Sequence, residues 1–158
     1  MTRRTVTASV TAAVPASTAF AAVTDWERQG EWMPLTRVTA EGSGRAVGDG
    51  IRAVTGIGPL AFVDSMRITR WDPERRCDVL HTGRVVRGTG TFAVDPLGPD
   101  RSRFTWTEEL DVPLGAVGRV AWRCGGAAAT ALAARWALRR WAHWAEARAA
   151  LRDLPLKG

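Results

Sequence analysis

The first residues of the chain alternate strictly between polar and apolar side chains. From Thr5 to Ala13, threonine and serine alternate with valine and alanine, which predicts a half-buried strand. Pro15 ends it, and Ala16–Val23 predicts a short helix because Phe20 and Val23 are three residues apart. A second short helix is expected after it, with Asp25 as the N-cap and its end before Pro34.

From Leu35 the pattern changes to strands separated by turn residues. The predicted strands are Thr36–Glu41, Gly50–Thr55, Ala61–Trp71, Cys77–Thr82, Val85–Asp95 and Ser102–Val112. The connections are short and rich in glycine and proline, which favours antiparallel hairpins over helical crossovers.

The last third of the chain is helical in pattern. Residues 116–154 hold no proline, and alanine, leucine and tryptophan recur with arginine between them. One long helix is predicted over Ala116–Leu154, with Gly125–Gly126 as the candidate break. The fold class is therefore α+β: a seven-stranded antiparallel sheet, with two short helices after its first strand, buries one face against the final helix. We expect one domain over residues 1–158.

Strand parity predicts which side chains face the space between sheet and helix. The inward sets are Phe62, Asp64, Met66 and Ile68; Cys77, Val79 and His81; Val86, Gly88, Gly90, Phe92 and Val94; and Phe104, Trp106, Glu108 and Leu110. Asp64, His81 and Glu108 are the polar members that matter. An imidazole and two carboxylates on a largely apolar face are suited to general acid–base chemistry, and these three are the candidate catalytic residues.

Structural roles for the same groups stay open. His81 is also compatible with a hydrogen-bonded core histidine, and Glu108 with a position at a cavity mouth or an ion pair with arginine. No metal site is expected, because the three lie on separate strands without ligand spacing. The chain has no tyrosine to act as an acid and no GxSxG motif for a nucleophile.

On the long helix, a broad face is predicted to contain Ala133, Ala137, Arg140, Trp141, Trp144, Arg148 and Leu151, opposite Arg135, Arg139 and Glu146. Arg140 has two predicted orientations, outward to solvent or inward to a carboxylate. The expected ligand-lining residues are Trp32, Phe62, Met66, Val79, Phe92, Trp106, Leu110, Trp136, Arg140 and Trp144.

Composition and charge narrow the class of protein. The 158 residues carry a net charge of +6, and the whole excess lies in residues 112–158, because the acidic and basic residues of the first 111 cancel. Cys77 and Cys124 have no CxxC spacing, which argues against a zinc site or a disulfide scaffold and suits the cytoplasm. No signal peptide and no membrane-spanning segment are expected.

Two stretches resemble the helix-grip superfamily that includes START, pollen-allergen and polyketide-cyclase proteins (SRPBCC). PASTAFAAVTDWERQGEWMP resembles the opening of its members, and MRITRWDPERRCDVLHTGRVVRGTGTFAVDPLGPDRSRFTWTEELDVPLG is similar to the strand block of actinobacterial polyketide-cyclase/dehydrase-like members. The resemblance implies a curved sheet that wraps around the last helix and leaves a cavity between sheet and helix.

The function expected from this resemblance is the binding of a small hydrophobic or aromatic, polyketide- or lipid-like molecule. If the protein is an enzyme, the implied reaction is cyclisation or dehydration without a metal or other cofactor. The alternative is a non-catalytic module that binds a partner or a lipid surface through the basic last helix. We expect a monomer or homodimer that does not bind nucleic acid.

Overall fold

The computed structural model describes residues 2–84, 86–112 and 127–152, to which all structural statements refer. The elements in chain order are β1 (Thr2–Ala12), α1 (Ala16–Val23), the 3₁₀ helix η1 (Trp26–Glu31), β2 (Thr36–Glu41), β3 (Gly50–Thr55), the 3₁₀ turn η2 (Gly58–Leu60), β4 (Phe62–Asp72), β5 (Arg76–His81), β6 (Gly88–Gly98), β7 (Arg101–Val112) and α3 (Ala127–Arg152).

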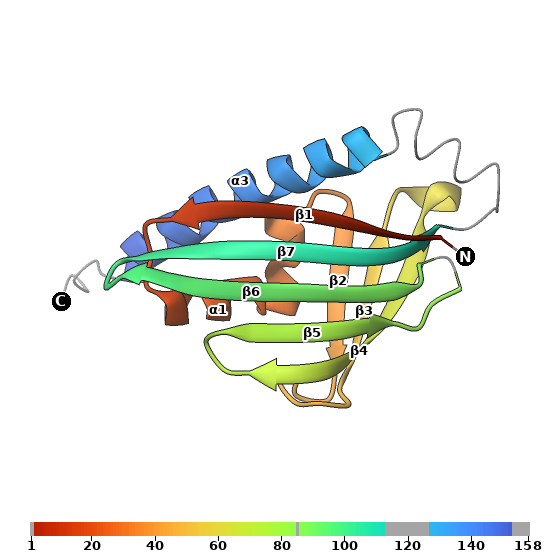
Figure 1. Ribbon diagram of the computed structural model, residues 1–158, viewed down its shortest axis with the longest axis horizontal. Coiled ribbons are helices and arrows are strands. Elements are labelled where there is room, and N and C mark those ends of the chain that lie inside the picture. The colour runs from red at the N-terminus through yellow and green to blue at the C-terminus, as the bar shows by residue number, and fades with distance from the viewer. Residues whose placement is uncertain (1, 85, 113–126, 153–158) are drawn as a thin grey trace.

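One curved antiparallel sheet contains all seven strands, in the order β1-β7-β6-β5-β4-β3-β2. The helix-grip prediction is thereby confirmed: α3 crosses one face of this sheet and lies along β1 (Figure 1). The predicted β strands agree with the observed ones to within three residues at each end. The described part of the helix begins directly after Gly125–Gly126, and the prediction for residues 116–126 lies outside the described residues.

Two details differ from the sequence predictions. The second short helix is a 3₁₀ helix, and the side chain of Asp25 makes no capping hydrogen bond to it. The inner face of α3 is rotated relative to the predicted one, because Leu138, Ala142 and Ala145 are buried while Leu151 is exposed. Alanines on this face let the helix approach the sheet closely, which no helical projection of the sequence alone can show.

The core lies between α3, α1 and the concave face of the sheet. Trp141 of α3 is fully buried, and its ring centroid lies 4.8 Å from that of Phe104 on β7. Phe92 on β6 contacts Phe104 and Trp106 edge-on. Glu146, predicted on the outer side of α3, instead accepts a 2.8 Å hydrogen bond from the backbone N–H of Ala13, so it ties the helix to the end of β1.

Within the described ranges, no helix has the length and apolar character needed to cross a bilayer.

Candidate functional site

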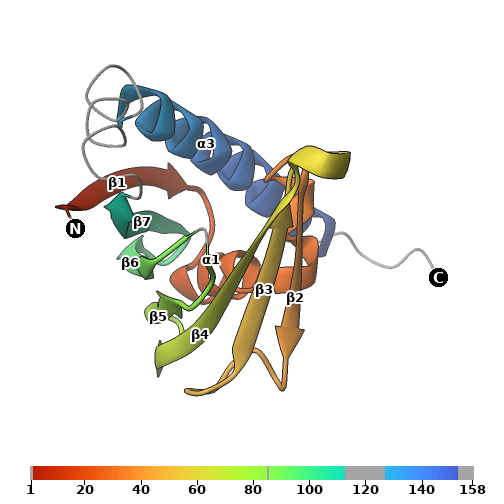
Figure 2. The same cartoon turned by 90° about the vertical axis from the view of Figure 1, so that its right-hand side faces the viewer.

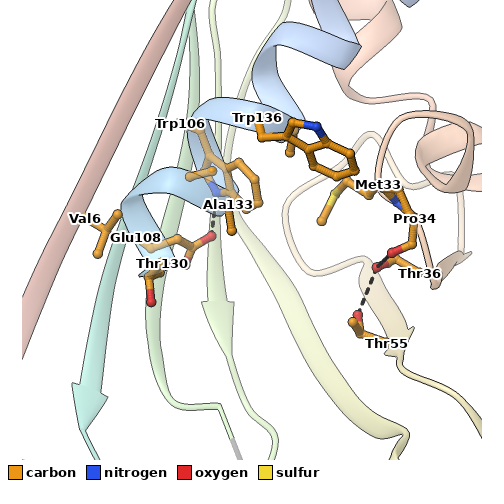
Figure 3. A pocket seen from close by; sticks show the side chains of 12 residues that line it. Val6, Met33, Pro34, Thr36, Thr55, Trp106, Glu108, Thr130, Ala133 and Trp136 are labelled. Atoms are coloured by element: carbon orange, nitrogen blue, oxygen red, sulfur yellow. Dashed lines mark hydrogen bonds between the residues drawn. The ribbon is translucent and has the colours of Figure 1, made fainter. Parts of the chain in front are cut away.

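Two adjoining cavities lie between the sheet and the N-terminal half of α3. The inner cavity has a volume of about 290 Å³ and the outer one about 280 Å³. Six residues line both, namely Met33, Thr36, Thr55, Trp106, Glu108 and Thr130. Each volume is close to the lower end of the range of about 300–1,000 Å³ found for small-molecule sites. Figure 3 shows the outer cavity, with Trp106 and Glu108 on one side and Met33, Pro34 and Thr36 on the other.

Asp64, His81 and Glu108 meet in the wall of the inner cavity. His81 Nδ1 lies 3.0 and 2.9 Å from the two carboxylate oxygens of Asp64, and Nε2 lies 2.9 Å from Glu108 Oε2. The indole N–H of Trp106 donates a 2.6 Å hydrogen bond to Glu108 Oε1. The three side chains are 4%, 14% and 18% exposed for His81, Asp64 and Glu108. The structure thus joins the three predicted inward polar groups into one hydrogen-bonded cluster.

A glycine on β6 makes room for this cluster. His81 is on β5 and Glu108 on β7, so a whole strand lies between them, and β5 and β7 are about 9–10 Å apart. In the sheet register His81 pairs with Gly88, and Glu108 with Gly90. A Cβ at Gly90 would lie 3.0 Å from Glu108 Oε1. The absence of a side chain at Gly90 therefore leaves room for the carboxylate to reach the imidazole across β6.

Asp64 reaches the same imidazole from the other side. It lies on β4 two residues before Met66, which pairs with His81, and so both point to the same face. The cluster is built by three strands, β4, β5 and β7.

The two carboxylates control the protonation of His81. Burial alone would lower its pKa, but the hydrogen bonds to Asp64 and then to Glu108, together with their negative charges, raise the pKa from 6.5 to about 9. At neutral pH His81 is therefore an imidazolium that donates through both nitrogens. With both carboxylates ionised, the cluster carries one net negative charge, and no lysine or arginine of the described chain lines either cavity.

The raised pKa predicts that stability depends on pH. A group with a higher pKa in the folded state stabilises the fold fully below its unfolded pKa, here 6.5, and this contribution is lost as the pH rises through about 9. We expect the free energy of unfolding to fall by about 3 kcal/mol between pH 6 and 9. Denaturant unfolding across this interval measures it, and a profile as flat as that of His81→Leu would contradict it.

Restricting that experiment to pH 9 and below separates the effect of His81 on stability from the effect of Cys77. Burial raises the pKa of the Cys77 thiol to about 12, with a smaller contribution from the charge of Asp78. This thiol affects stability mainly above the ordinary cysteine pKa of 9.0.

Seven of the ten side chains predicted to line the ligand site do line a cavity. Phe62, Met66, Val79, Phe92, Trp106 and Leu110 line the inner cavity, and Trp106 and Trp136 line the outer one. Trp32, Arg140 and Trp144 line neither of these two cavities. Trp32 is fully buried in the core.

Arg140 and Trp144 join α3 to η1 instead. The guanidinium of Arg140 donates to the backbone carbonyls of Glu31 and Trp32, and lies 5.1 Å from the centre of the Trp136 ring. Trp144 donates its indole N–H to the Glu31 carboxylate at 2.6 Å. These residues hold η1 against the helix, which fixes the side of the cavity formed by Met33 and Pro34.

Several lining residues were not among the sequence candidates. Met33 follows η1, and Thr36 and Thr55 face each other across β2 and β3 with their hydroxyl groups 3.1 Å apart. Thr36 shares strand parity with buried Val38, and this signal was available in the sequence. Across the described residues, no group of three or more histidine, cysteine, aspartate or glutamate side chains is arranged to hold a metal ion.

The sequence profile of the family described as polyketide cyclase / dehydrase and lipid transport matches residues 3–151. The chain belongs to this family. No curated protein sequence matches it. Among solved structures, the Zhui aromatase/cyclase from Streptomyces sp. R1128 is similar at 20% identity with a TM-score of 0.74, covering 94% of this chain and 96% of that one.

Two further solved structures share the fold. A START superfamily protein from Mycobacterium smegmatis has 21% identity and a TM-score of 0.60, with coverage of 83% of this chain and 95% of that one. Norcoclaurine synthase from Thalictrum flavum, solved with dopamine and hydroxybenzaldehyde, has 13% identity and a TM-score of 0.63, with coverage of 98% and 90%. These likenesses establish the fold of this polyketide cyclase/dehydrase family member.

Proposed function

We propose that the protein binds an aromatic or polyketide-like molecule in the two adjoining cavities and promotes its cyclisation or dehydration. The observation that carries the proposal is the Asp64–His81–Glu108 cluster, which places two carboxylates in the wall of a largely apolar cavity. The family description and the aromatase/cyclase neighbour support the substrate class. The proposal includes the reducing, cytoplasmic setting expected from the cysteine pattern.

The charge of the cluster indicates which ligand atoms it accepts. A phenol, enol or amine donates a hydrogen bond to a carboxylate, whereas a ligand carboxylate would face a cluster with one net negative charge, and no lysine or arginine of the described residues lines either cavity. Neutral hydroxylated aromatic and poly-β-keto molecules therefore suit the site better than fatty acids.

In the proposed reaction, Glu108 transfers the proton, and His81 positions the Glu108 carboxylate. Glu108 lines both cavities, while both His81 nitrogens are engaged by carboxylates. The Glu108 carboxylate takes a proton from the carbon between two carbonyl groups, and the resulting enolate attacks a third carbonyl of the same chain. The alkoxide that forms takes the proton back from the cluster. Loss of water from the β-hydroxy ketone then gives the conjugated ring.

Titration of the protein with 2-naphthol and 2-naphthoate tests the binding part of this proposal. We expect 2-naphthol to quench tryptophan fluorescence through Trp106 and Trp136, and 2-naphthoate to bind at least about tenfold more weakly, since it brings a negative charge to a negative site. Ala133→Trp should weaken 2-naphthol binding by filling the outer cavity, and Ala150→Trp, on an exposed part of the same helix, should not. Equal affinity for both ligands would contradict the proposed charge selection.

A further inference from the structure

The hairpin end between β3 and β4 is an exposed apolar tip. Leu60 of η2 is 87% exposed, Ile57 is 68% exposed and Leu35 is 62% exposed. The backbone N–H of Gly56 donates to the carbonyl of Leu35 at 2.9 Å, so the two turns that carry these side chains are adjacent. In Figure 1, η2 is the short yellow turn at the end of the molecule away from the C-terminus, and Figure 2 shows it projecting beyond the strands.

The composition of this tip is unusual for a surface hairpin. Residues 53–63 hold no charged side chain, although one residue in four is charged over the whole chain. Polar residues are sufficient to form a solvent-exposed hairpin turn. Isoleucine and leucine side chains that project from it therefore indicate contact with an apolar phase or partner. η2 is held by hydrogen bonds from Leu60 N to the carbonyl of Ile57 and from Ala61 N to that of Gly58, which keeps the apolar side chains pointing outward.

Two arginines flank the tip. Arg37 and Arg52 lie on the outer face of β2 and β3, where they line an open groove of about 470 Å³ together with Leu35 and Gly56. Neither guanidinium has an ion-pair or hydrogen-bond partner within the described part of the chain. Guanidinium groups bind phosphate oxygens in a bidentate manner. The groove therefore offers an anionic headgroup two guanidinium groups next to an apolar tip.

We propose that this end of the molecule, comprising Leu35, Ile57, Leu60 and the groove arginines Arg37 and Arg52, docks on an anionic phospholipid surface. The tip favours a bilayer over a protein because its apolar side chains project singly from a narrow turn. A fluid apolar phase accepts such side chains without a complementary pocket, and the arginines meet the headgroup phosphates beside it.

The docking surface adjoins the cavities. Thr36 lines the groove, the outer cavity and the inner cavity, and Phe62, at the start of β4, lines the inner cavity directly after the tip. A hydrophobic molecule dissolved in the membrane would therefore enter the cavities from the side of the protein that touches the lipid. This inference stands on the surface alone and does not depend on the proposed reaction.

Co-sedimentation with vesicles tests the inference. We expect the wild-type chain to bind vesicles of phosphatidylcholine mixed with phosphatidylglycerol, and to bind pure phosphatidylcholine more weakly. Arg37→Gln and Arg52→Gln should each weaken binding to the anionic vesicles about fivefold. Ile57→Ser with Leu60→Ser should weaken it at least about tenfold, because the inserted apolar area is lost.

Matched controls separate the tip from general effects. Val47→Ser changes an exposed apolar residue on another loop, and Arg101→Gln changes an exposed arginine at the start of β7; both should bind like the wild type. All six positions are exposed, and thermal unfolding should show no change in any variant. The inference is overturned if the wild type does not bind anionic vesicles, or if the variant with Ile57→Ser and Leu60→Ser binds them as the wild type does. Binding of the tip to a protein would not change either conclusion.

Discussion

Glu108→Gln is expected to lower the rate of cyclisation of a linear poly-β-ketone thioester by about 10²–10⁴-fold, the range for loss of one general acid–base group. The substitution keeps the size of the side chain and its ability to accept the 2.6 Å hydrogen bond from Trp106. It removes the carboxylate that takes the proton. The rate constant should therefore fall while the affinity for 2-naphthol changes by only a few fold, and product formation followed by absorbance measures the rate.

Glu109→Gln is the matched control for this experiment. Glu109 is the next residue on β7, but its side chain lies on the opposite face of the sheet, 3.9 Å from Arg3 and 43% exposed. It should retain the wild-type rate. If Glu108→Gln also cyclises the substrate at the wild-type rate, Glu108 does not move the proton, and the proposed mechanism is wrong even if the ligand still binds.

His81→Leu is expected to reduce the free energy of unfolding by about 3–5 kcal/mol, the usual cost of removing one partner from a buried charged pair. The leucine leaves Asp64 and Glu108 with less than one-fifth of their side-chain surface exposed and with no cation between them. Adding Asp64→Asn and Glu108→Gln to the same chain should recover part of the loss, because the buried negative charges are then gone. Urea unfolding near neutral pH measures all three proteins.

The second histidine provides the comparison for this variant. His143 lies on the exposed side of α3, and His143→Leu should change stability by no more than about 0.5 kcal/mol. A His81→Leu protein that unfolds within about 1 kcal/mol of the wild type would show that the imidazole does not hold the two carboxylates together.

Strand parity was sufficient to predict the polar members of the site, but not their bonding. A period of two places Asp64, His81 and Glu108 on one face of the sheet whatever the exact register. Their hydrogen bonds depend on which residues of β6 lie between His81 and Glu108. The register puts Gly90 opposite Glu108, and a one-residue change in the pairing would place a threonine side chain beside Glu108 on the same face.

The differences on α3 and η1 have a different origin. A helical projection gives the angular order of Arg140, Trp141 and Trp144 but not the arc that faces the sheet. That arc is set by close packing of small residues such as Ala142 and Ala145. Trp32 follows a 3₁₀ helix whose position is set by α3, through a contact between segments more than 100 residues apart, so a local pattern in the sequence does not show whether its ring faces the core or a cavity.

A structure of the protein with 2-naphthol bound would show whether the cluster holds the ligand. We expect the ring in the inner cavity, against Trp106 and Phe92, with the naphthol oxygen about 2.5–3.0 Å from a carboxylate oxygen of Glu108 or Asp64. A naphthol bound elsewhere on the surface, or one whose oxygen points away from both carboxylates, would contradict it.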